Sequence, residues 1–284
     1  MPTRTIYTTS EVTIGASGTV LGDAHLVSAV TSATFTQDTP REQVTVFGKK
    51  GQVDTVQNES TSSTIEIVFH PYINTAGLEG VDPESADPAL YFEPADLKLL
   101  MDDSAKDNPT GETILVRGVG KLTAALLTSI TAEGSVGALP TITLGFDGNG
   151  VVDATAVATI DAASYNIANM ENVSLAAGSG NTGSYAQTAS FNWEMPIEKL
   201  NRLGNSVESA TTYGTPPGTA SISVEGTDDA GVITSVEFGG WTLTLDGDSK
   251  KSNVTNNMAV GEIGATYNTT TEGVADGCNS TATV

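Results

Sequence analysis

The 284-residue chain is poor in the side chains that most often carry out chemistry. It has one cysteine, Cys278, which excludes an internal disulfide framework and a zinc site built on cysteines. Its two histidines, His25 and His70, lie far apart in the sequence, so there are almost no candidate residues for histidine-based catalysis or metal ligation. These scarcities favour a structural or binding role over catalysis.

Basic residues and long apolar runs are scarce too. The chain has 12 Lys and Arg against 34 Asp and Glu, a net charge of −22, which argues against a protein that holds nucleic acid or anionic membranes by charge attraction. No apolar run approaches the roughly 18 to 20 residues of a membrane span, and residues 1–10 lack the apolar core of a secretory signal. We therefore expect a protein made in the cytosol that does not associate with membranes.

The sequence does contain many segments with the residue pattern of β-strands. Apolar and polar residues alternate with a period of two, which indicates strands with one buried face. The clearest cases are residues 44–47, 64–69, 141–144, 221–224 and 241–245. Glycine-rich segments between them, at residues 147–150, 239–240 and 246–248, have the composition of turns. The sequence predicts a mainly β, antiparallel fold.

One segment has helical spacing instead. Residues 93–103 have Pro94 near their start, carry acidic residues in the first turn, and place Leu97, Leu100 and Met101 on one face. We predict a short helix near 94–104. The Gly- and Pro-rich residues 70–88 that precede it, together with residues 176–182 and 211–218, are predicted to be exposed loops.

An internal repeat organises the chain. Phe35, Pro40 and Gly48 match Phe191, Pro196 and Gly204 at a constant offset of 156, and a slip of one residue then places Ile65 and Ile67 on Ile222 and Val224. The repeat predicts two tandem β domains, residues 1–155 and 156–284, the first enlarged by the insert that holds the helix. The two halves carry net charges of −12 and −10, so the acidity is a property of both and not of an acidic tail.

No constellation of residues predicts an enzyme or a metal centre. Residues 147–153 resemble a calcium loop, but Val151 and Val152 stand where a ligand and the turn glycine belong, so we predict a hairpin turn there and another at 246–248. The segment 118–121 lacks the spacing of a phosphate-binding loop. His70 is interpreted as a polar residue at a strand end. Trp193 and Trp241 are assigned to core packing or a subunit contact. We predict no catalytic, cofactor-binding or metal-binding residues.

Residues 190–204, followed by the Ser- and Thr-rich residues 219–226, resemble the tail tube (major tail) proteins of long-tailed bacteriophages. In that family a strand, a Pro-Ile/Val-Glu step, a Leu-Gly turn and a further Ser- and Thr-rich strand recur. Residues 35–48 and 63–69 look like a degenerate copy, in which Arg41 and Gln43 replace more typical residues and Phe47-Gly48 stands for Leu-Gly. The resembling segments cover about a quarter of the chain.

The resemblance implies two β-sandwich or half-open barrel domains of tail-tube type, with a short helix flanking the first. A chain with two such units is expected to form trimeric, pseudo-hexameric rings that stack head to tail into the tube of a virion tail, assembled in the bacterial cytoplasm. Its partners would be other copies of itself and other tail proteins, with a sheath or without one. Genomic DNA would pass through a lumen whose carboxylates repel the phosphate backbone.

Two functions of other classes share the same composition. A β-sandwich adhesin or capsid-decorating module would remain a small closed oligomer and would be stabilised by a ligand. A polysaccharide-degrading β protein would need paired carboxylates in one cleft. For the tube, exposed residues 71–88 and 172–184 are the candidate segments that contact the next ring.

Overall fold

The computed structural model describes residues 12–15, 25–27, 29–39, 41–45, 47, 54–57, 61–73, 92–106, 109–116, 118–151, 166–167, 173–179, 186–197, 219–227, 230–257 and 266–280. In this part of the chain every strand pairing is antiparallel, and there is one helix, so the predicted mainly β class is confirmed. The helix, α1, spans Pro94–Ser104, as predicted.

The strands of the first half begin with two short ones and end with two long ones. They are β1 (Val12–Gly15), β2 (His25–Val27), β3 (Val30–Asp38), β4 (Arg41–Val44), β5 (Asp54–Gln57), β6 (Ser62–Phe69), β7 (Tyr72–Ile73), β8 (Glu112–Val116), β9 (Gly120–Ser135) and β10 (Thr141–Val151). Those of the second half are β11 (Asn166–Ile167), β12 (Val173–Ser179), β13 (Ala186–Glu194), β14 (Thr219–Gly226), β15 (Val232–Phe238), β16 (Trp241–Leu245), β17 (Lys250–Asn257) and β18 (Thr266–Ser280).

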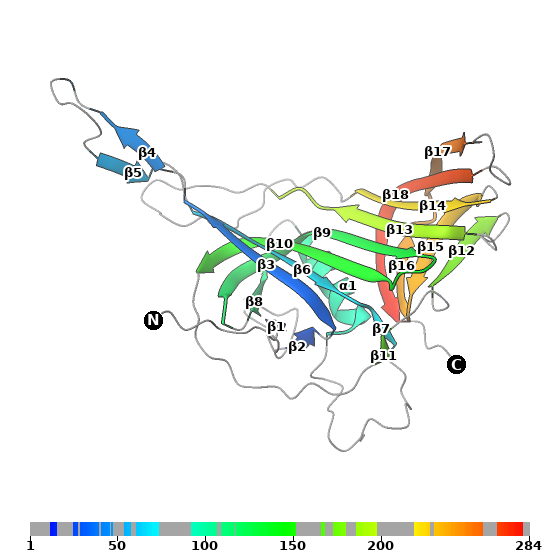
Figure 1. The fold of residues 1–284 in the computed structure, drawn as a ribbon, viewed down its shortest axis with the longest axis horizontal. Helices are drawn as coiled ribbons and strands as arrows, with labels where there is room; N and C mark the ends of the chain where they lie inside the picture. Colours follow the sequence, from blue (N-terminus) through cyan, green and yellow to red (C-terminus); the bar gives the residue numbers. More distant parts are fainter. Residues whose placement is uncertain are drawn as a thin grey trace, which may run out of the picture.

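Fourteen of these strands form one sheet that runs through both halves of the chain (Figure 1). Its main path is β12-β15-β16-β18-β14-β13-β9-β10-β6-β3, while β8, β1 and β2 extend from β9, and β17 lies beside β18. The halves meet where β13 pairs with β9. Two small hairpins or pairs, β4 with β5 and β7 with β11, lie outside this sheet.

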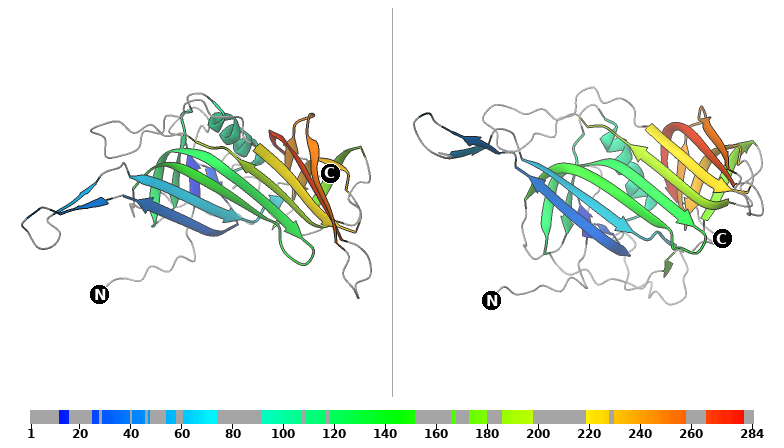
Figure 2. Two further views of the ribbon diagram at one scale, coloured as in Figure 1. Left: turned by 90° about the horizontal axis from the view of Figure 1, so that it is seen from above. Right: turned by 45° about the horizontal axis from the view of Figure 1, so that its top comes forward.

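One face of the sheet is covered by a single hydrophobic core. In β6, Ile65, Ile67 and Phe69 are buried, while the alternate residues Thr64 and Glu66 are exposed, as the period of two requires. Helix α1 lies against β18 and β9 on the core side and buries Leu97, Leu100 and Met101. A helix from the first half therefore packs on a strand of the second (Figure 2).

Aromatic contacts also join the halves. The buried ring of Trp241 lies 5.4 Å from that of Phe69 in an edge-on arrangement, and 6.0 Å from that of Phe92. The packing role predicted for Trp241 fits this position. Because sheet and core are continuous, and because residues 152–165 around the predicted boundary lie outside the described residues, the division into domains 1–155 and 156–284 stays a prediction.

The two halves nevertheless have the same strand order. In the first half the pairings run β1-β8-β9-β10-β6-β3. In the second they run β12-β15-β16-β18-β14-β13, with β17 continuing along β18 beyond β16. Strand β9 thus corresponds to β16 and β17 together.

The correspondence extends to individual residue pairs. Strands β3 and β6 pair at eight positions, and β13 and β14 pair at the eight positions reached by adding 156 to each β3 residue and 157 to each β6 residue. Phe35 opposite Ile65 thus becomes Phe191 opposite Ile222. Both pairs of strands skip one residue at the same place, after Val30 and after Ala186. These are the two offsets on which the sequence repeat was aligned.

A second bulge also recurs. Between β9 and β10 the register skips Thr128, whose hydroxyl donates a hydrogen bond to the Gly145 carbonyl oxygen at 3.0 Å. Between β17 and β18 it skips Ser252, whose hydroxyl donates to the Thr270 carbonyl oxygen at 3.4 Å. Since β10 and β18 occupy the same place in the strand order, the two hydroxyl groups occupy equivalent positions.

Several local predictions need correction. Residues 147–150 do not form a hairpin turn: they continue β10, where Gly148 packs so closely on the β9 backbone that only glycine fits. Residues 176–179 were predicted as loop but belong to β12, which pairs with β15. At the start of the predicted 70–88 loop, Pro71 is buried and Tyr72–Ile73 forms β7. Short polar or glycine-rich strands of this kind lack the alternation that identifies strands from sequence.

Other predictions agree with the structure or lie outside it. The turns at 239–240 and 246–248 are present, the first with both glycines at positive φ. The strands predicted at 64–69, 141–144, 221–224 and 241–245 are present. Of the strand predicted at 44–47, only Val44 lies in a strand, since β4 ends there and the described residues Thr45 and Phe47 are not in one. The predicted loop at 211–218 and the matched residues Gly48 and Gly204 lie outside the described residues.

The close contact at Gly148 gives the first prediction. A Cβ atom there would lie 2.8 Å from the Thr123 carbonyl oxygen and 2.9 Å from Ala125 Cα. We expect Gly148→Ala to lower the free energy of unfolding by about 1–3 kcal/mol, because the backbone of β9 must move. Urea denaturation measures the change. Gly247→Ala is the matched control, since nothing lies within 4 Å of its Cβ position, and a loss as large there would contradict the steric explanation.

Candidate assembly surface

Four strands of the main sheet, β2, β3, β12 and β17, pair with only one other strand in the described part of the chain. We consider here β3 and β17, whose equivalents in the other half, β13 and part of β9, pair with each other. Strand β3 pairs with β6 and with no other described strand, and it ends the main path of the sheet. Strand β17 pairs in the same way with β18 alone. An open strand edge presents backbone N–H and C=O groups that can pair with another chain. The two edges are therefore candidates for contacts between molecules.

Burial distinguishes the edge strand β3 from its equivalent β13. Strand β13 pairs on both sides, and its Phe191 and Trp193 are 0% and 3% exposed. In β3 the equivalent Phe35 is only partly buried and the equivalent Gln37 is exposed. The same position in the repeat is thus covered by a neighbouring strand in one half and left uncovered in the other.

The face of the sheet opposite the core is polar and acidic. Seven consecutive strands, from β18 to β3, each place at least one acidic residue between buried or core-facing neighbours, on the outer face. These residues are Glu272, Glu225, Glu194, Glu133, Asp147, Glu66 and Asp38. We call this surface the acidic face. Among these seven strands the sequence has one basic residue, Lys121, at the start of β9.

A hairpin arm projects from the body of the molecule. Strands β4 and β5 pair with each other, continue from the end of β3, and extend well beyond the main sheet in all three views (Figures 1 and 2). Every residue of β4 is exposed. Phe47, which follows β4, is fully exposed at 106%. The arm thus presents an apolar side chain well away from the body of the molecule, where another molecule can reach it.

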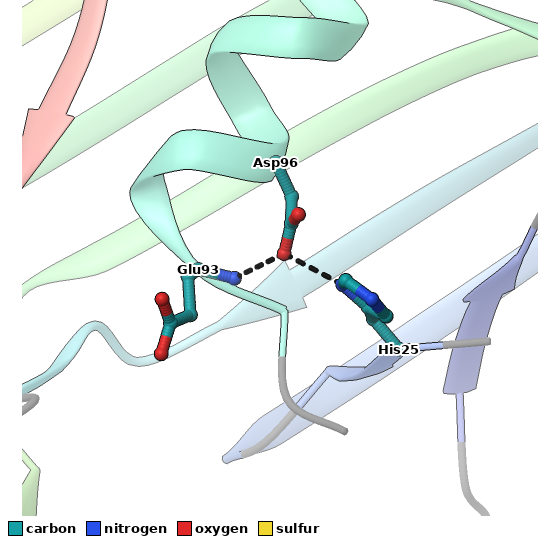
Figure 3. Close-up of polar contacts among 3 residues, drawn as sticks. All are labelled: His25, Glu93 and Asp96. Atoms are coloured by element: carbon teal, nitrogen blue, oxygen red, sulfur yellow. Dashed lines mark hydrogen bonds and ion pairs between the residues drawn. The ribbon is translucent and has the colours of Figure 1, made fainter. Parts of the chain in front are cut away.

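His25, which the sequence analysis did not assign to catalysis, has a structural partner. His25 Nδ1–H donates a hydrogen bond of 2.8 Å to Asp96 Oδ2, and the same oxygen accepts the backbone N–H of Glu93 at 2.8 Å (Figure 3). Glu93 precedes the first turn of α1, so Asp96 caps the helix. This cluster fixes β2 to the start of α1.

The remaining candidate residues also have structural surroundings. His70 lies at the end of β6, as predicted, and its Nδ1–H donates to the Pro140 carbonyl oxygen at 2.7 Å. Trp193 is buried in the core. Of residues 118–121, the first two lie in the turn before β9 and the last two begin β9. Among the described residues, no group of three or more His, Cys, Asp or Glu side chains is arranged to hold a metal ion.

Sequence reasoning did not find the β17 edge or the acidic face. Strand β17 has the sequence Lys-Lys-Ser-Asn-Val-Thr-Asn-Asn, which has no apolar alternation because it has almost no buried residues. The local signal for the acidic face is weak, because only one of the five predicted strands, 64–69, places an acidic residue, Glu66, between apolar neighbours. That pattern becomes a surface only when the strand order is known.

Comparison with known proteins gives no assignment: no family model matches the chain, and no curated protein matches it. Within the described residues, no helix has the length and apolar character needed to cross a membrane. The function must therefore be argued from the chain's own geometry.

Cys278 gives the second prediction. Burial strongly raises the pKa of its thiol, while the nearby Lys98 lowers it to a smaller extent, and the side chain is 1% exposed. We expect the native protein not to react with an aromatic disulfide reagent at pH 8, and one thiol per chain to react after unfolding in guanidinium. Rapid reaction of the native protein would contradict the burial of β18 against α1.

Proposed function

We propose that the chain is a structural subunit that assembles with copies of itself into stacked rings, forming the tail tube of a long-tailed bacteriophage. It has no catalytic role in this proposal. The observation that carries it is the repeated strand register: two units with the same order, the same offsets and the same bulges stand side by side in one sheet, and the sheet ends in open edges.

The repeated register supports a duplicated tube domain. Eight equivalent pairs and two equivalent bulges require that both halves fold to the same local pattern, although few residues in them are identical. Helix α1 and β7 lie between β6 and β8, where the second half passes from β14 to β15 in a few residues. The first unit is thus the larger one, as the repeat alignment requires.

The open edges suit a ring. Two different open edges of one sheet, those of β3 and β17, can pair head to tail with the next copy until the ring closes. A closed ring of this kind removes both edges, which is how proteins prevent uncontrolled strand pairing. Three copies with two units each would give the pseudo-hexameric ring that the resemblance implies.

The acidic face is the surface that we assign to the lumen. The opposite face is covered by the core and by α1, so a ring of joined sheets would turn the face bearing Glu66, Glu133 and Glu194 toward the axis. Fixed carboxylates there would repel the phosphates of a passing DNA molecule and keep it from binding the wall. In this arrangement the joined sheets form the wall of the tube, and the acidic face lines its lumen.

The hairpin arm is suited to contacts between rings. It reaches beyond the sheet and carries Phe47 fully exposed. Residues 41–57 contain three basic and two acidic residues, in a chain whose net charge is −22. A slightly basic arm with an apolar residue can bind the acidic body of a second copy.

Electron microscopy of the purified protein tests the proposal and gives the third prediction. We expect rings with a central opening, and tubes of stacked rings at high protein concentration. A variant with residues 42–56 replaced by a short Gly-Ser linker is expected to form rings but not tubes, because the edges remain while the arm is lost. Monomers at every concentration tested, with no rings or tubes in particles that contain the protein, would contradict the proposal.

A further inference from the structure

We propose that β3 of one molecule pairs antiparallel with β17 of the next, in the register that places Thr36 opposite Thr255. This inference rests on the proposed assembly and adds to it the two strands, the partner and the residue pairs of the contact between molecules. It follows from a junction that the molecule already contains between its own halves.

The internal junction is the pairing of β13 with β9. Asn192 lies opposite Thr131, Trp193 opposite Ile130, and Glu194 opposite Ser129. This pairing joins the last strand of the second unit to a strand in the middle of the first. It is the junction through which the two units share the main sheet.

The equivalent of β13 is β3. With the offset of 156, Asn192 corresponds to Thr36 and Glu194 to Asp38. The pairing of β3 with β6 has the same register as that of β13 with β14, which confirms the match at every position. The β3 edge that corresponds to the β9-facing edge of β13 pairs with no other strand in the described part of the chain.

The equivalent of the second half of β9 is β17. Leu144 lies opposite Ile130, and Thr269, which occupies the place of Leu144, lies opposite Val254. The matching bulges at Thr128 and Ser252 fix the register, so Thr131 corresponds to Thr255 and Ser129 to Asn253. The far edge of β17, like that of β3, pairs with no other described strand.

Because β3 corresponds to β13 and β17 to the second half of β9, each residue pair of the β13–β9 junction predicts a residue pair between β3 and β17 of neighbouring molecules. Thr36 would lie opposite Thr255, Asp38 opposite Asn253, and Gln37 opposite Val254. Val254 is 43% exposed, although it occupies the place of the fully buried Ile130. Pairing with β3 would cover it, as β13 covers Ile130.

Charge at the two edges is consistent with this pairing. Strand β3 has no charged residue except Asp38 at its end, and β17 begins with Lys250 and Lys251. In the antiparallel register proposed, the end of β3 lies beside the start of β17, so opposite charges meet. Two lysines at one edge are notable in a chain with only 12 basic residues.

Cross-linking of paired cysteines tests the register. Thr36→Cys combined with Thr255→Cys places two exposed positions directly opposite each other. In assembled protein, dibromobimane, which joins closely spaced thiols, is expected to link chains into a ladder that ends at the number of copies in the ring. Asp38→Cys with Asn253→Cys is a second pair in the same register, for use if the first variant does not assemble.

Two matched variants control the experiment. Thr36→Cys with Val254→Cys is out of register by one residue, which puts the thiols on opposite faces, so no ladder is expected. Asn192→Cys with Thr131→Cys is the equivalent pair inside one chain, and it should link within the chain in every state. The native Cys278 is buried and should not react.

The possible results separate the two proposals. A ladder from the in-register pairs, absent from the out-of-register pair, supports the β3–β17 contact. Rings or tubes in which only the intrachain control is linked would overturn this contact and leave the tube proposal standing. Equal ladders from both pairs would overturn the register, and the absence of any assembly would overturn both proposals.

Discussion

Main-chain hydrogen bonding between β13 and β9 is the interaction on which the architecture depends. It converts two sets of strands into one sheet, and it covers Phe191 and Trp193, which would otherwise resemble the partly exposed Phe35 and the exposed Gln37 of β3. The same demand for strand partners remains unmet at β3 and β17 in the described part of the chain. A sheet that pairs one such edge inside the molecule, and leaves the equivalent edges of β3 and β17 open, is suited to a repeating assembly.

The core supports this junction from one side. Trp241 of the second half packs on Phe69 and Phe92 of the first, and α1 lies across β9 and β18. Since these contacts cross the middle of the chain, the two units cannot separate without exposing apolar surface. The other face carries one or more acidic residues on each strand from β18 to β3. One face of the sheet therefore packs against the core, and the other presents charge.

Much of this fold could be predicted from sequence, and the exceptions have physical reasons. The strand at 64–69 and the helix at Pro94–Ser104 were found because buried side chains impose a period of two or 3.6. The offsets of 156 and 157 reproduce the strand register, because the Phe and Ile residues that make the sequence repeat visible also lie opposite each other in the paired strands. Strand β17 was missed because its residues are exposed, and 147–150 were misassigned because glycines serve there for close packing and not for a turn. The candidate surface depends on strand order, which local pattern does not specify.

Hydrogen–deuterium exchange of the assembled protein and the monomer tests the central claim most directly. If β3 and β17 pair between molecules, their backbone amides should be protected in the assembly and exchange quickly in the monomer, while those of β13 and β9 should be protected in both. Equal exchange of β3 and β17 in the two states, in a sample shown to be assembled, would contradict the account.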